Sequence, residues 1–105
     1  MKKLKGIDGK LDEAWSKLVK LKAGWKCIYC GKESYVQAHH IYSRSNRSVR
    51  RDVDNGASLC AGHHTLSSGF SAHKTPLEFA EWIKERNGEE WYNSLRLKAN
   101  PVKKW

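Results

Sequence analysis

The alternation of apolar and polar residues predicts helices at both ends of the chain and a short β segment between them. From Lys10 to Ala23, apolar residues return every three or four positions with lysines between them, which is typical of an amphipathic helix. Gly24 follows at the position where glycine commonly ends a helix. The stretch "SYVQAHHIY", residues 34–42, is rich in β-forming residues and predicts a strand.

The middle of the chain predicts a loop, a second strand and a short helix. Residues 43–56 are polar with few apolar positions, so we expect a long loop that ends in an Asn-Gly turn. "ASLC", residues 57–60, predicts a short strand, and "AGHHTLSSG", residues 61–69, predicts a short helix. The cysteines would then lie just outside both strands.

The clearest helix signal begins at Thr75. Thr75 would be the N-cap, Pro76 the first helical residue, and Glu78 would complete a capping box. The apolar residues that follow form a broad face, and the pair Asn87–Gly88 would end the helix.

A last helix is predicted over residues 89–99, ending before Pro101. The length of 105 residues suggests a single domain. We divide it into an N-terminal helix (1–24), a metal-bound strand segment (25–73) and C-terminal helices (74–105). The expected fold class is α+β.

The formal net charge of +9 points to a polyanionic partner, with nucleic acid the first choice and an anionic membrane surface the second. No apolar run approaches the roughly 20 residues that a membrane span needs. The N-terminal stretch "MKKLKGIDGK" has no apolar core of a signal peptide. We therefore expect a cytoplasmic protein with no membrane partner.

The three cysteines, an odd number without a secretion signal, argue against a disulfide framework. Cys27 and Cys30 have the spacing of a redox motif, but no thioredoxin-like context surrounds them. The same spacing is half a zinc site, and Cys60 with His63 supplies a second pair. The set predicts one structural Zn²⁺. The alternatives are three unrelated buried thiols, or an unknown fourth ligand if His63 is free.

All five histidines lie within residues 39–73. His40, Asn55 and His64, in "AHHI", "NGASLC" and "CAGHH", resemble the signature of the HNH (ββα-metal, His-Me finger) endonucleases. The gaps of fifteen (55 − 40) and nine (64 − 55) residues are usual for that family. The resemblance covers about Cys27–His73, and "SAHKTPLEFAEWI" is similar to text in phage-type members. Many members carry cysteine pairs at these positions that bind a structural zinc. The resemblance therefore implies such a zinc here, and it implies a protein encoded by a bacterium or a phage.

The resemblance also implies a role for each residue. His40 would be the general base that activates water, and His39 would bind the catalytic metal. Asn55 would hydrogen-bond backbone across the loop and so orient His40. His64 would be a second metal ligand. His73 would be a third ligand, a phosphate contact, or neither.

The residue types suit this chemistry independently of the family. Phosphodiester hydrolysis needs a nucleophile, charge neutralisation and help for the leaving oxygen, and a histidine can accept a proton at neutral pH. Neutral imidazoles around one divalent ion, such as Mg²⁺ or Mn²⁺, favour one-metal catalysis. Adjacent residues on a regular strand point to opposite faces, so His39 and His40 share a site only if the strand bends or ends. His63 and His64 diverge by about 100° on a helix, so one could face zinc and the other the catalytic metal.

Arginines concentrate in the predicted loop, where their guanidinium groups match phosphate geometry. Lys74 is a further candidate for a phosphate contact. A solvated polar loop is the alternative interpretation. The candidates in the loop are Arg44, Arg47, Arg50 and Arg51.

We therefore expect a zinc-bound ββα-metal core flanked by helices in a monomer or weak dimer. The expected activity is metal-dependent hydrolysis of double-stranded DNA, with one strand nicked per site. A non-catalytic zinc module that binds DNA or protein is the first alternative. An enzyme with a cysteine nucleophile is the second.

Overall fold

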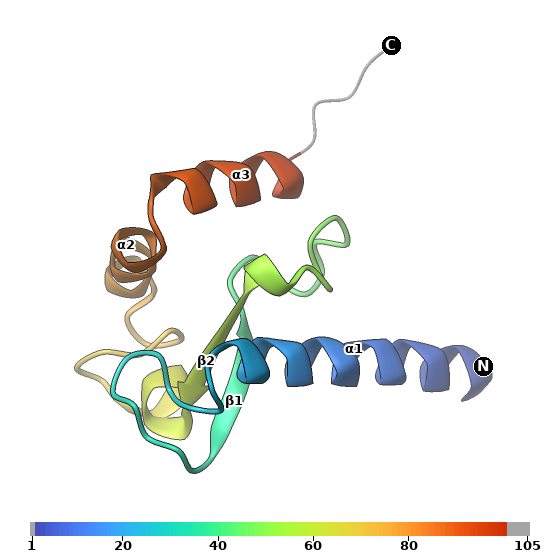
Figure 1. Cartoon of the computed structure of the whole chain (residues 1–105), viewed down its shortest axis with the longest axis horizontal. Helices are drawn as coiled ribbons and strands as arrows, with labels where there is room; N and C mark the ends of the chain where they lie inside the picture. The colour runs from blue at the N-terminus through green and yellow to red at the C-terminus, as the bar shows by residue number, and fades with distance from the viewer. Residues whose placement is uncertain (1, 101–105) are drawn as a thin grey trace.

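Two antiparallel strands lie at the centre of the molecule, and three long helices surround them (Figure 1). The computed structural model describes residues 2–100, with side chains from residue 7 onward. This arrangement confirms the α+β class. None of the helices in residues 2–100 combines the length and the hydrophobicity that a membrane span requires. The elements are α1 (Lys2–Lys22), β1 (Val36–His40), the 3₁₀ turn η1 (Val53–Asn55), β2 (Gly56–Cys60), the π-helical turn η2 (Gly62–Leu66), α2 (Pro76–Asn87) and α3 (Glu89–Ala99).

The strand register separates the two neighbouring histidines of β1. His39 pairs with Ala57 and His40 pairs with Gly56, so the ladder is regular through both positions. Side chains alternate between the faces of a regular strand. His39 and His40 therefore lie on opposite faces of the sheet.

The helix α1 covers the His40 face of the sheet. Its buried residues are Trp15 and Val19, each 4% exposed, and a Cβ atom at Gly56 would overlap the side chain of Val19. The helix begins eight residues earlier than the predicted start at Lys10, and its N-terminal end projects beyond the rest of the chain (Figure 1). It ends as predicted, with Gly24 at φ +70°.

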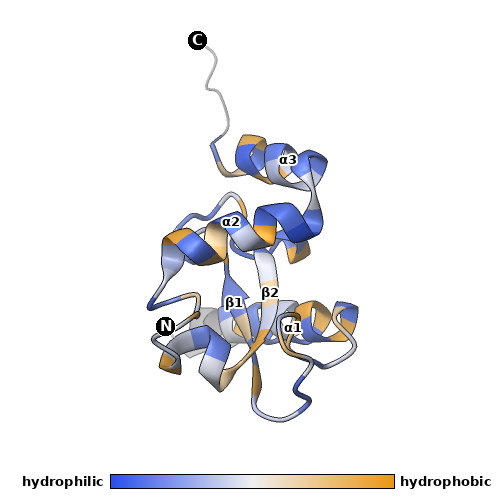
Figure 2. Ribbon diagram, turned by 90° about the vertical axis from the view of Figure 1, so that its left-hand side faces the viewer, coloured by the Kyte–Doolittle hydropathy of each residue, from blue (hydrophilic) through white to orange (hydrophobic). Residues whose placement is uncertain are grey.

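The helix α2 covers the other face. Phe79 and Ile83 pack against Ala57 and Leu59 in one buried cluster. Figure 2 shows hydrophobic and hydrophilic positions alternating along α2 and α3, as expected for helices with one packed face. The pattern of the sequence predicted the end of α2 at Asn87 and the bounds of α3, while Pro101 lies outside the described residues.

Thr75 is the residue before α2, but the predicted capping box is wrong. Its hydroxyl donates to the carbonyl of Ser71 and accepts from the Ser71 N–H, both at 2.9 Å. The side chain therefore makes no capping bond to α2. The hydroxyl instead closes the turn over residues 71–75, because both of its hydrogen bonds go to the backbone of Ser71, four residues earlier.

The junction between loop and β2 also differs from the prediction. Asn55 ends η1, and Gly56 is extended at φ −125°, so the pair does not form a turn. Cys60 is the last residue of β2, within the strand predicted over residues 57–60 and not just outside it. The helix predicted over 61–69 is a shorter, wide turn, Gly62–Leu66.

Asn55 holds the long loop closed. Its side chain is fully buried, and its Oδ1 accepts from the Tyr42 N–H at 2.6 Å. Its Nδ2 donates to the carbonyls of Tyr42 and Val49, at 3.1 and 3.2 Å. One amide thus joins the residues after β1 to the far end of the loop.

We expect Asn55→Ala to lower the free energy of unfolding by about 2–4 kcal/mol, because three backbone groups lose a buried partner. Urea unfolding of the zinc-loaded protein measures the change. The control is Asn93→Ala, on the exposed face of α3, with an expected change within about 0.5 kcal/mol. Equal effects of the two substitutions would contradict the role of Asn55.

Candidate functional site

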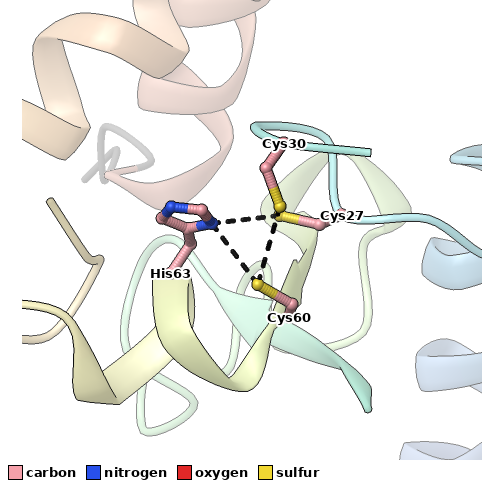
Figure 3. Close-up of side chains that lie close together, drawn as sticks. All are labelled: Cys27, Cys30, Cys60 and His63. Atoms are coloured by element: carbon pink, nitrogen blue, oxygen red, sulfur yellow. Dashed lines mark hydrogen bonds between the residues drawn. The ribbon is translucent and has the colours of Figure 1, made fainter. Parts of the chain in front are cut away.

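Three cysteines and one histidine converge beside the sheet (Figure 3). Their ligand atoms all lie within 4.8 Å of one another. Cys30 Sγ is 3.8 Å from Cys60 Sγ, and His63 Nδ1 is 3.3 Å from Cys60 Sγ and 3.7 Å from Cys27 Sγ. Tetrahedral zinc with bonds of about 2.3 Å to sulfur and 2.0 Å to nitrogen needs separations of about 3.8 and 3.5 Å. The cluster could therefore hold a metal ion such as zinc, as the spacing predicted.

Backbone hydrogen bonds build the turn that carries the first two sulfurs. The Gly31 N–H donates to the Cys27 carbonyl at 2.8 Å, and Gly31 takes the positive φ of +80° that this tight turn requires. The Ile28 N–H donates to the Ser58 carbonyl at 2.9 Å. The Ser58 hydroxyl in turn donates to the Lys26 carbonyl at 2.8 Å. These bonds dock the turn against β2, next to Cys60.

The charges of the thiols favour a bound cation. Burial raises the pKa of Cys27, but backbone N–H groups and His63 outweigh it and lower the pKa to about 6. Partial burial of the Cys30 sulfur and its contacts with Cys27 and Cys60 raise the pKa of Cys30. One thiolate therefore opposes the ionisation of its neighbour. A divalent cation would remove that opposition, since it attracts every thiolate.

A second cluster consists of imidazoles alone. His64 Nε2 lies 3.2 Å from His39 Nδ1 and 3.2 Å from His73 Nε2, and the three ligand atoms lie within 4.8 Å of one another. His64 Nδ1 donates to the side-chain carbonyl of Gln37 at 2.6 Å, so its Nε2 lone pair faces the other two rings. Such a bond commonly orients a metal-ligating histidine. Gln37 was not identified from the sequence; the one pattern that points to it is its position two residues before His39, on the same face of the strand.

The His39 and His64 imidazoles of this cluster are held in the neutral form. Burial, and then the positive charge that His64 and His73 would carry, lower the pKa of His39 to about 3. Burial and the neighbouring His73 also lower the pKa of His64. Neutral rings present lone pairs, which are the form that binds metals.

His40 lies apart from this cluster, on the α1 face of the sheet. Its ring stacks on Trp15 with centroids 3.8 Å apart and planes 8° from parallel. Its Nε2 donates to the Arg50 carbonyl at 2.9 Å, because a carbonyl oxygen can only accept. The Nδ1 lone pair is then available as a base. Burial lowers the pKa of His40, although the bond to Arg50 opposes this.

Most of the predicted phosphate-binding arginines are engaged within the chain. Arg50 makes a two-point contact with Asp12, at 2.8 and 3.3 Å. Arg51 contacts Asp12 and Asp8, each at 3.2 Å, and Arg44 lies 3.5 Å from Asp12. These arginines lower the pKa of Asp12, Arg50 most strongly through its hydrogen bond. They join the loop to α1 and are only partly available to a phosphate.

Arg47 and Lys74 are exposed. In the described part of the chain, no carboxylate lies within ion-pair distance of either. They are the predicted contacts most open to a polyanion.

Comparisons with protein-family models, with curated proteins and with solved structures found no match to this chain.

We expect the adjacent substitutions His63→Ala and His64→Ala to differ sharply. The first removes a ligand of the thiol cluster and should release zinc, expose reactive thiols and lower the melting temperature. The second lies outside that cluster and should retain zinc and the fold. Metal content after dialysis and thiol titration measure the difference. Equal zinc retention would contradict the assignment of His63.

The free energy of unfolding of the protein, with no metal bound at the imidazole cluster, should fall in acid. The pKa of His39 is about 3 in the folded chain and about 6.5 in the unfolded chain. Between these values the unfolded chain binds a proton that the folded chain does not, so stability is complete above pH 6.5 and decreases as pH falls toward 3. We expect His39→Gln to lose less stability between pH 7.5 and 5 than the unsubstituted protein, measured by urea unfolding. An identical loss would argue against a buried neutral His39.

Proposed function

We propose that this chain is a metal-dependent endonuclease of the HNH, ββα-metal class that hydrolyses DNA phosphodiester bonds. The observation that supports it most is the division between His63 and His64. These consecutive residues contact two donor sets of different chemistry, one of thiols and one of imidazoles. A thiolate-rich set suits a structural zinc. An imidazole set that includes the exposed His73 leaves room for substrate.

In this proposal β1, β2 and η2 form the ββα unit. His39, His64 and His73 would hold one divalent ion such as Mg²⁺ or Mn²⁺. When bound, such an ion would supply positive charge at the scissile phosphate and the leaving oxygen. Gln37 keeps His64 in the orientation that presents its Nε2.

His40 acts as the general base through Nδ1. Its Nε2–H is held by the Arg50 carbonyl, which fixes the ring and leaves Nδ1 to accept a proton from water. Asn55 positions the loop that supplies this carbonyl, through its bond to Val49 next to Arg50. The Trp15 ring prevents the imidazole from turning.

The opposite faces of His39 and His40 restrict how substrate can lie. Within residues 2–100, β1 is paired along one edge only, with β2. A phosphate placed across the unpaired edge would approach both faces of the strand. The duplex backbone therefore runs along this edge, with one strand cut per site.

The net charge of +9 supports attraction to DNA. Arg47 and Lys74 are the first phosphate contacts in this proposal. Arg44, Arg50 and Arg51 contribute less, because a phosphate has to compete with Asp12. Affinity should therefore fall steeply with salt.

A zinc-stabilised DNA-binding module without activity is the second candidate. The thiol cluster and the charge support it equally well, but it assigns no role to the imidazole cluster. A cysteine nucleophile is less favoured, because all three thiols lie in one cluster with His63.

Conversion of supercoiled plasmid to nicked circle tests the proposal. We expect nicking with Mg²⁺ or Mn²⁺, none with excess EDTA, and a loss of roughly 100-fold or more in His40→Ala, the usual range for a general base. His64→Ala should also be inactive, and both variants should bind DNA as the unsubstituted protein does.

The control is Asn93→Ala, which should nick normally. DNA binding without cutting under any metal would favour the binding module. Normal nicking by His40→Ala would exclude His40 as the base.

A further inference from the structure

One face of α1 carries a row of apolar side chains that nothing in the described chain covers. Ile7, Leu11, Leu18 and Leu21 are 56%, 46%, 51% and 61% exposed, and Ala14 between them is also exposed. We call these five residues the α1 seam. It is distinct from the buried residues Trp15 and Val19, which pack on the sheet. The packing of the fold and the proposed active site therefore leave the seam without a role.

The residues of the α1 seam have the spacing of a heptad repeat. They follow one another at intervals of four, three, four and three, which is the heptad pattern of helices that pair side by side. An average period of 3.5 residues keeps these side chains in one narrow row along the helix, and such a row on one helix can interlock with the same row on a second helix. The N-terminal end of α1 projects from the molecule and is accessible to another helix (Figure 1).

We propose that the α1 seam is a dimerisation surface whose partner is the α1 seam of a second copy of this chain. The heptad row is complementary to itself, and a two-fold dimer needs one self-complementary patch. The proposal does not depend on nuclease activity. If both hold, two strand-cutting sites would be joined in one particle, which suits the two strands of a duplex.

The area and charge of the seam make this dimer weak. Four large side chains, each about half exposed, offer less than the roughly 800 Å² per partner of a standard stable interface. Lys10 and Lys17 lie along one flank of the seam. Pairing places lysine against lysine, Lys10 facing Lys17 in an antiparallel pair and Lys17 facing Lys22 in a parallel pair. Salt screens this repulsion, so association should tighten as salt rises.

Sedimentation equilibrium of the zinc-loaded full chain tests the proposal over a wide range of concentration, at low and high salt. The average mass should rise from 12.1 kDa toward twice that value, more readily at high salt. Leu18→Lys should weaken association roughly tenfold or more, and Ala14→Leu should tighten it by a similar factor, because it fills the small central position. Circular dichroism verifies that each variant is folded.

The matched control is Leu97→Lys, which charges an exposed leucine of α3, 66% exposed, away from the seam. It should associate as the unsubstituted chain does. Monomers at every concentration, in both the unsubstituted chain and Ala14→Leu, would overturn the proposal. So would equal weakening by Leu97→Lys and Leu18→Lys. Binding to vesicles of anionic lipid without self-association would assign the seam to a membrane surface and also overturn it.

Discussion

The convergence of three cysteine sulfurs with the His63 ring is the interaction on which the rest of the structure depends. The sheet has only two strands of five residues, and a sheet of this size is marginally stable alone. The cluster joins the turn before β1, the end of β2 and the turn η2. A metal ion there would fix the backbone of β1 and η2, from which His39, His40 and His64 project. The folding of the chain and any activity of these histidines would then both require the same metal ion.

Two local geometries distribute four histidines among three environments. The alternation of a strand sends His39 to the imidazole cluster and His40 to the α1 face. The divergence of neighbours on a helical turn sends His63 to the sulfurs and His64 to the imidazoles. The wide turn η2 therefore couples the two clusters directly. The helix α1 completes the surroundings of His40. Trp15 stacks on the His40 ring. Asp12 pairs with Arg50, whose backbone carbonyl accepts the hydrogen bond from that ring.

Features encoded by local patterns could be predicted from the sequence. The paired spacing of cysteines predicted the sulfur cluster, and apolar periodicity with a terminal glycine predicted α2 and α3. Contacts between distant segments left no comparable signal, which is why the stacking of Trp15 and the pairing of Arg50 with Asp12 were missed. The capping box failed because a hydroxyl can satisfy the preceding turn equally well. The start of α1 was placed too late because Gly6 and Gly9 weaken the helical pattern there.

We propose that the adjacent residues His63 and His64 serve two metal sites of different chemistry. Zinc-edge X-ray absorption of the protein with one and then two equivalents of zinc distinguishes these two sites. We expect the first ion to have three sulfur ligands at about 2.3 Å and one nitrogen ligand at about 2.0 Å. The second ion should add nitrogen and oxygen ligands only. A first ion without sulfur, or a second ion that shares the sulfurs, would contradict the division between His63 and His64.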